Sequence, residues 1–165
     1  MITPDKRRKY LLGRVSDGYL AVDVEKILCV FRAVEITFIP TMKEHLLGVL
    51  VWNKAVLPVV DLAVSRPPCF EYKGMGGVVV TIKGRDDDMS LGIFFEQILC
   101  LKDAARTHFN WRDKFNLRRT FYLTECFSVK LDVTLDGVMI PVIEGEKIIE
   151  FFKHTSNGLK GGGKW

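Results

Sequence analysis

The sequence contains little cysteine and no long apolar run, and both shortages exclude classes of protein. Its longest apolar stretch stops before Asn53 and is too short to span a bilayer. The basic start leads into only a short apolar run and does not resemble a signal peptide, so a cytoplasmic location is expected. The four cysteines form no Cys-x-x-Cys pair and have no histidine at ligand spacing, so we interpret them as buried thiols in a reducing cytosol. They are Cys29, Cys69, Cys100 and Cys126.

Motifs that would carry catalysis or hold a cofactor are also missing. No serine stands in a Gly-x-Ser-x-Gly motif, and His45, His108 and His154 are scattered along the chain. The acidic run GRDDDMSLG lacks the spacing of an EF-hand loop, and KGMGGVVV lacks the lysine and hydroxyl pair of a Walker motif. The sequence therefore predicts no catalytic residue, no metal site and no cofactor, and the protein is not expected to be an enzyme.

Charge of one sign is only slightly in excess. The chain has 24 Lys and Arg residues against 20 Asp and Glu residues, a net charge of +4, which permits a polyanionic partner without requiring one. Basic segments that include Trp111, Phe115 and Phe121 leave one alternative open, a small β-barrel nucleic-acid-binding protein. Asp5, Asp113 and the low net charge argue against nucleic acid as a partner.

Short apolar runs rich in β-branched and aromatic residues make up most of the chain. Turn signals separate them into four predicted β-hairpins. These turns fall at residues 16–18, 53–54, 84–90 and 135–137. Asp23 is placed to cap a short helix over residues 24–32, where apolar residues recur at helical spacing. We expect a long loop, with at most one helical turn, over residues 102–120, and a short helix over residues 145–154. The predicted fold class is all-β with short helices.

One pattern occurs twice. KAVLPVVDLAV begins at Lys54, and the similar DGVMIPVIEGE begins at Asp136, so that Pro58 and Pro141 lie 83 residues apart. Such a repeat indicates two similar β lobes. A proline donates no ladder hydrogen bond, so each is expected at a sheet edge or a bulge.

An acidic residue follows each of these prolines. Asp61 and Glu144 come where each strand is expected to leave its sheet. A carboxylate there can accept backbone N–H hydrogen bonds or cap the next turn. We therefore expect Asp61 and Glu144 to have a structural role.

Three segments, taken in order, resemble the CheW-like family, the adaptor domain of bacterial chemotaxis. They are GVLVWNKAVLPVVDL, LGIFFEQIL and DGVMIPVIEGEKII. The resemblance extends over residues 10–152 and implies a single domain of two five-stranded, SH3-like β-barrel lobes packed together. Residues 153–165 are expected to form a flexible tail.

The resemblance also implies a function. In this family the protein is a non-enzymatic scaffold of a two-component signalling system, linking chemoreceptors to the histidine kinase CheA. The hairpin tip of the receptor lies in an apolar groove between the lobes, and the regulatory domain of CheA packs lobe to lobe with the adaptor. The expected location is then the cytoplasm, at receptor arrays on the inner face of the membrane.

Some positions differ from the family pattern. The Arg-Gly of the family's hairpin turn is Asn53-Lys54 here, and lysine offers a point charge without the fork of arginine. The usual glutamate of the first helix falls at Cys29, and the acid of the family's Gly-Leu-x-Val-Asp segment is Glu96. Trp52 is a candidate anchor of a protein interface. The candidate partner-binding residues are Ile27, Val30, Trp52, Asn53, Lys54 and Val56.

Overall fold

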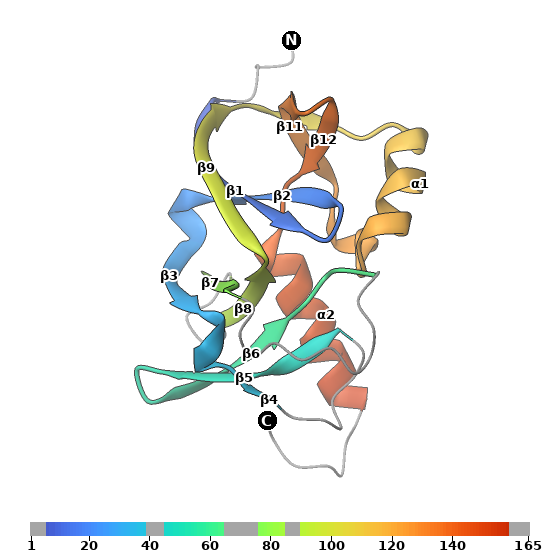
Figure 1. The fold of residues 1–165 in the computed structure, drawn as a ribbon. Helices are drawn as coiled ribbons and strands as arrows, with labels where there is room; N and C mark the ends of the chain where they lie inside the picture. Colours follow the sequence, from blue (N-terminus) through green and yellow to red (C-terminus); the bar gives the residue numbers. More distant parts are fainter. Residues whose placement is uncertain (1–5, 39–44, 65–75, 85–89, 159–165) are drawn as a thin grey trace.

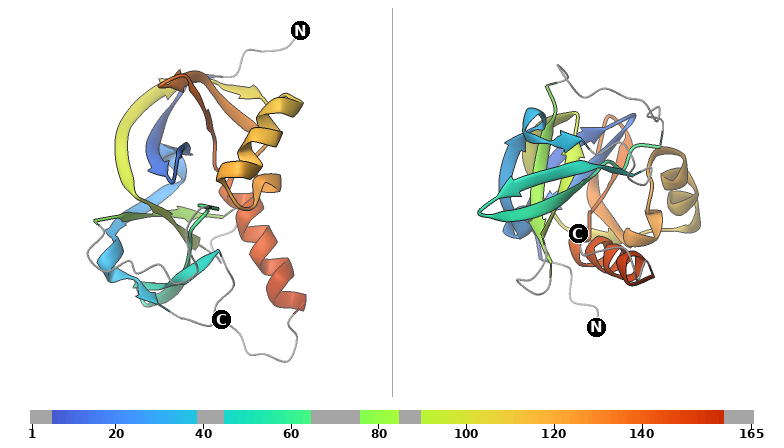
Figure 2. Two further views of the ribbon diagram at one scale, coloured as in Figure 1. Left: turned by 45° about the vertical axis from the view of Figure 1, so that its right-hand side comes forward. Right: turned by 90° about the horizontal axis from the view of Figure 1, so that it is seen from below.

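Two β lobes make up the part of the chain that the computed structural model describes, which is residues 6–38, 45–64, 76–84 and 90–158 (Figure 1). Lobe one is formed by the middle of the chain, and lobe two by its beginning and end. In Figure 2 (left) the lobes lie one above the other. The predicted all-β class with short helices is confirmed.

Lobe one is a six-stranded sheet in the order β3-β7-β8-β6-β5-β4. The pairs are antiparallel except for β6 and β8, which run parallel. Its strands are β3 (Ile27–Arg32), β4 (Thr37–Phe38), β5 (Leu46–Trp52), β6 (Ala55–Val60), β7 (Val78–Lys83) and β8 (Ser90–Phe95). Since β4 has only two residues, five longer strands form the lobe, as expected.

Lobe two consists of two three-stranded sheets, β2-β1-β9 and β10-β11-β12. A parallel bridge between Ala21 and Val142 joins the sheets on one side, and the Asp132 N–H donates to the Ala105 carbonyl on the other. With β9 and β10 counted as one bent strand, the lobe again has five. The bounds are β1 (Arg8–Val15), β2 (Gly18–Asp23), β9 (Gln97–Ala104), β10 (Arg106–His108), β11 (Val129–Leu135) and β12 (Val138–Pro141).

The sequence repeat corresponds to one hairpin in each lobe. The β5–β6 turn has Asn53 at φ 53° and Lys54 at φ 66°, and the β11–β12 turn has Asp136 at φ 52° and Gly137 at φ 75°. Two positive φ values are the mark of a type I′ turn, whose twist matches that of the flanking strands.

The two prolines take equivalent places in these hairpins. Pro58 pairs with Val49 of β5, and the parallel pairing with β8 begins only at the next residue. Pro141 ends β12, an edge strand of its sheet, and the residue after it forms the parallel bridge to β2. In each lobe, therefore, the chain enters parallel pairing directly after the proline. Pro141 lies on an edge strand, whereas Pro58 lies on β6, which stands between β8 and β5 in its sheet.

A single apolar core joins the lobes. Leu20 of lobe two, Phe95 of lobe one and Ile148 of the last helix all belong to one cluster of buried side chains. The helix is α2 (Gly145–Gly158), which runs down beside lobe one from the junction of the lobes (Figure 2, left). Because both lobes bury residues in this cluster, neither lobe can open without exposing apolar surface of the other.

Two sequence-based predictions of local structure are wrong. Asp23 does cap a helix, but only the one-turn 3₁₀ helix η1 (Val24–Lys26), and residues 27–32 form strand β3. Pairing with β7 overrides the helical spacing of the apolar residues.

The second wrong prediction is the long loop over residues 102–120. This segment contains the end of β9, strand β10 and helix α1 (Trp111–Thr120). The Asn110 side chain caps α1 by accepting from the Asp113 N–H, while the Asp113 carboxylate accepts from the Asn110 N–H. The one-turn 3₁₀ helices η2 (Ala33–Glu35) and η3 (Thr124–Cys126) complete the fold, and α2 continues to Gly158, past the expected end of the domain at residue 152.

Candidate partner-binding surface

The outer face of the β5–β6 hairpin exposes valine. Val51 and Val56 face each other across the two strands, and they are 69% and 60% exposed. Val49 and Pro58 form the next pair on the same face, because side chains alternate along a strand. Leu50 and Leu57 point the other way and are buried in the core of lobe one. The hairpin thus presents an exposed apolar surface beside a polar turn, and we call these four outward residues the hairpin patch.

Trp52 lies on the opposite face from Val51. It is half-buried and packs against the core cluster of lobe one, with its ring edge-on to that of Phe31 at 6.3 Å between centroids. The neighbouring turn residues Asn53 and Lys54 are exposed. Most of the tryptophan's contact area is therefore engaged within the protein, and the valines offer more free apolar surface.

Ile27 and Val30 do not share a face, since β3 is a strand and not a helix. Ile27 is half-buried and packs against the core that joins the lobes. Val30 points outward and is 47% exposed. Leu28, two residues earlier on the same strand, is 37% exposed. The contact between Phe31 and Trp52 places the end of β3 next to the hairpin. Val30 and Val56 therefore lie on the outside of the same lobe.

Sequence reasoning missed Val51 and Leu28. The sequence did hold a signal for Val51, because Val51 is next to Trp52 and successive side chains of a strand point to opposite faces. If Trp52 packs inward with Leu50, then Val51 must point outward. For Leu28 the error followed from reading β3 as a helix.

Asp61 and Glu144, the acidic residues of the two sequence repeats, have different surroundings in the structure. Asp61 is buried, and its Oδ1 accepts from the Ala63 N–H at 3.1 Å, which stabilises the bend after β6. The Glu144 carboxylate accepts from the Ser128 hydroxyl at 2.6 Å and pairs with Lys147 at 3.1 Å. The backbone carbonyl of Glu144 accepts from the Lys147 N–H at the start of α2.

Replacing Asp61 with alanine is expected to lower the free energy of unfolding by about 1–3 kcal/mol, because the buried Ala63 N–H loses its acceptor. Asp61→Asn keeps a carbonyl oxygen at the same place and should lose less. Urea denaturation of both variants measures the difference. Equal stability of Asp61→Ala and the parent would show that this hydrogen bond contributes nothing.

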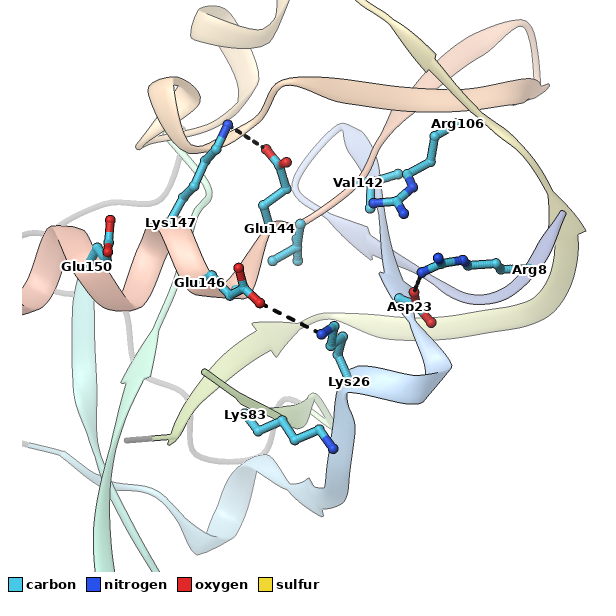
Figure 3. A pocket seen from close by; sticks show the side chains of 12 residues that line it. Arg8, Asp23, Lys26, Lys83, Arg106, Val142, Glu144, Glu146, Lys147 and Glu150 are labelled. Carbon is cyan, nitrogen blue, oxygen red and sulfur yellow. Dashed lines mark hydrogen bonds and ion pairs between the residues drawn. The ribbon is translucent and has the colours of Figure 1, made fainter. Parts of the chain in front are cut away.

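A cavity of about 400 Å³ opens between the lobes at the start of α2 (Figure 3). Its lining is mostly charged, and only Val142, Ile143 and Gly145 are uncharged. This cavity is therefore not the apolar groove between lobes that the family resemblance implies. Ion pairs in its wall join Arg8 to Asp23 at 3.1 Å, Lys26 to Glu146 at 3.8 Å and Lys147 to Glu144 at 3.1 Å.

Among the side chains that the structure describes, which exclude those of residues 152–158, no three His, Cys, Asp or Glu residues are grouped so that they could hold a metal ion. The described part of the chain includes no helix with the length and apolar character needed to cross a membrane.

The described cysteines differ in their surroundings. Cys126 is buried, and burial raises the pKa of its thiol to about 11. Cys100 is exposed and Cys29 is half-exposed, while Cys69 lies outside the described residues. Because the thiolate is the reactive form, Cys126 should be inert at neutral pH.

An alkylating reagent at pH 8 is therefore expected to modify Cys100 in the folded protein and Cys126 only after unfolding, as peptide mass mapping would show. The raised folded-state pKa also means that Cys126 supports stability below its unfolded pKa of about 9 and loses that support as the pH rises through about 11. Modification of Cys126 in the native protein at the rate of Cys100 would contradict this description.

The structure defines a two-lobed all-β protein in which an exposed apolar patch on one lobe is the candidate site. The family profile described as CheW-like domain matches residues 9–99, and the chain belongs to that family. It is 27% identical over 145 residues to the chemotaxis protein CheW of Thermotoga maritima, an alignment that covers 88% of this chain and 89% of that protein.

The fold is similar to the crystal structure of the scaffolding protein TtCheW from Thermoanaerobacter tengcongensis. The TM-score is 0.60 at 13% identity, and the superposition covers 87% of this chain and 86% of that chain. At this identity the likeness supports the two-lobed fold and does not bear on partners.

Proposed function

We propose that the protein is a chemotaxis adaptor that holds the hairpin tip of a chemoreceptor and the regulatory domain of the kinase CheA through protein contacts, without catalysis. Membership of the CheW-like family supports the adaptor role. The observation that carries the proposal for this chain is the hairpin patch, where Val51 and Val56 stand side by side and largely exposed. Exposed apolar residues grouped beside polar ones are typical of a protein interface.

The patch has the form of a small docking surface. Val49 and Pro58 extend the apolar pair along the strands, and the exposed Asn53 and Lys54 border it at the turn. A receptor hairpin is a helical rod, and a helix with an apolar stripe can bind such a surface while polar groups at the rim set its orientation. Val30 adds exposed apolar area on the same lobe.

The mechanism would be positioning. An adaptor that contacts receptor and kinase at once couples the conformational equilibrium of one to that of the other, provided that its contacts differ between the two states. No proton transfer or covalent step is needed. The unit that does this work is expected to be residues 10–152, in the cytoplasm at receptor arrays.

Titration of the full chain with the isolated CheA regulatory domain, and separately with a receptor hairpin-tip fragment, tests the proposal. We expect saturable binding in both titrations and a ternary complex in gel filtration when all three are mixed. Absence of binding to both partners would contradict the adaptor role.

A further inference from the structure

Helix α1 presents two large aromatic side chains to solvent. Trp111 is 75% exposed, and Phe115, one turn further along, is 56% exposed. Leu117 is the only buried residue of the helix. The helix is held to the protein by Leu117 and by the buried Phe121 just after it, whose backbone bridges to Ala63. Packing against the described part of the chain therefore gives no reason for aromatic side chains at Trp111 and Phe115.

Positive charge borders this aromatic pair on both sides. At 100° per residue, Arg112 and Arg119 lie along one flank of the Trp111–Phe115 row, and Lys114 and Arg118 lie along the other. All four cationic residues are exposed. The outward face of α1 thus combines a central apolar row with four positive charges.

The one acidic residue of α1 is turned away from this face. Asp113 accepts from the Asn110 N–H at 3.0 Å and pairs with Lys130 at 2.9 Å. Burial opposes its ionisation, but the Asn110 and Lys130 contacts outweigh burial and lower the pKa of Asp113. Glu125 on η3, which packs beside α1, is an exposed acid in the neighbouring segment.

The arginines lie over the aromatic rings. The guanidinium carbon of Arg112 is 5.3 Å from the centroid of the Trp111 ring, and that of Arg119 is 4.9 Å from the centroid of the Phe115 ring. A guanidinium stacked on a ring keeps its N–H edge free, and that edge matches a carboxylate in a two-point hydrogen bond. The stacking also holds the side chain in place before a partner arrives.

We propose that this face of α1 docks an acidic amphipathic helix of a partner protein, with apolar residues against Trp111 and Phe115 and carboxylates against the flanking cations. Charge complementarity selects the occupant, and the paired flanks fit a helix whose acids border an apolar stripe on both sides. This surface is distinct from the hairpin patch, since α1 and the β5–β6 hairpin lie on opposite sides of the molecule (Figures 1 and 2).

Other anionic occupants fit the face less well. A bilayer surface favours a helix with a broad apolar face, whereas α1 exposes only two aromatic residues among its ten. Single-stranded nucleic acid needs free ring faces on which bases stack, and Arg112 and Arg119 occupy one face of each ring. Phe121, the third aromatic residue considered for such a site, is buried against Phe127.

The test uses two fluorescent synthetic helical peptides with the same leucine stripe, one with glutamate and the other with lysine on both flanks. Anisotropy titrations with the full chain at low and moderate salt should give at least tenfold tighter binding of the glutamate peptide, weakening as salt rises. Arg112→Glu/Arg119→Glu should lose that binding at least tenfold and gain affinity for the lysine peptide. Lys9→Glu/Arg14→Glu, which reverses two exposed cations on β1, is the matched control and should bind like the parent.

Reversed peptide preference in the Arg112→Glu/Arg119→Glu variant supports the proposal, because a merely unfolded α1 would bind neither peptide. Equal binding of both peptides to the parent, or equal losses in the control variant, would overturn it. Tighter binding of phosphatidylserine vesicles or of an oligothymidylate than of the glutamate peptide would also overturn it, in favour of a membrane or a nucleic acid. Receptor and kinase take no part in these measurements, so the outcome is independent of the proposed adaptor function.

Discussion

Replacing Val51 and Val56 together with glutamate is expected to weaken binding of the receptor tip, the CheA regulatory domain or both by about thirtyfold or more, which corresponds to a hot-spot loss of about 2 kcal/mol. Both side chains are largely exposed, so glutamate can be accommodated without burying a charge. At the interface, however, two carboxylates would have to be desolvated against an apolar partner surface. Because the residues face each other across the strands, they act as one site and are changed together.

The measurement is a titration of each partner against the double variant, with circular dichroism to check the fold. Leu101→Glu is a matched control, since Leu101 on β9 of lobe two is 61% exposed, nearly the same as Val56. Trp52→Ala is a further comparison, because it removes the residue that the sequence favours as an anchor. If the folded Val51→Glu/Val56→Glu variant binds both partners as tightly as the parent, the hairpin patch is not the interface.

Phe95→Ala is expected to lower the free energy of unfolding by about 3–5 kcal/mol, the usual range for a large aromatic side chain lost from a core. Phe95 is buried in the cluster that both lobes share. A Cβ built on Gly13 of lobe two would lie 2.3 Å from the Phe95 ring, so the ring fills the space against that strand. Removing it therefore opens a cavity at the contact between the lobes.

Urea unfolding followed by tryptophan fluorescence and by circular dichroism measures this loss. The two probes should give one coincident transition in the parent, because the lobes share a core. Phe115→Ala is the control, since Phe115 is exposed, and it should change stability by less than about 0.5 kcal/mol. Two separate transitions in the parent would show that the lobes are energetically independent. A loss below about 1 kcal/mol in Phe95→Ala would show that this ring contributes little to the shared core.

The hairpins were predictable because their signals are local. Asn53-Lys54 and Asp136-Gly137 each stand between apolar runs, and a type I′ turn needs little beyond such residues and the strands beside them. The equivalence of Pro58 and Pro141 was visible for the same reason. Each proline follows its turn at the same distance, and the structure places both just before parallel pairing.

Residues 24–32 show where local pattern fails. The positions of Ile27, Leu28, Val30 and Phe31 fit a helix, yet the segment pairs with β7. An apolar run of this length fits either structure, and only a partner strand from later in the chain decides between them. The error carried over to the candidate site, because Ile27 and Val30 were both named as partner-binding residues of one helix, whereas they lie on opposite faces of β3.

Helix α1 was missed for a different reason. Most of its side chains are polar and exposed, so its sequence shows little apolar periodicity. The Asn110 and Asp113 capping interactions mark its start, but they are a weaker signal than a hydrophobic stripe. The aromatic residues Trp111 and Phe115 were noticed in the sequence, whereas their exposure became known only from the structure.

The sequence by itself determined the all-β class, the four hairpins and the resemblance to the CheW-like family, because each depends on residues that are near one another in the chain. Tertiary structure alone decided which side chains are free to bind. Val51 and Val56 are exposed while Trp52 packs inward, and Phe121 is buried while Trp111 is not. Exposure is set by strands and helices that arrive from distant parts of the chain. Alternation along a strand shows that Val51 and Trp52 lie on opposite faces, but only the packed structure shows which of the two faces is covered.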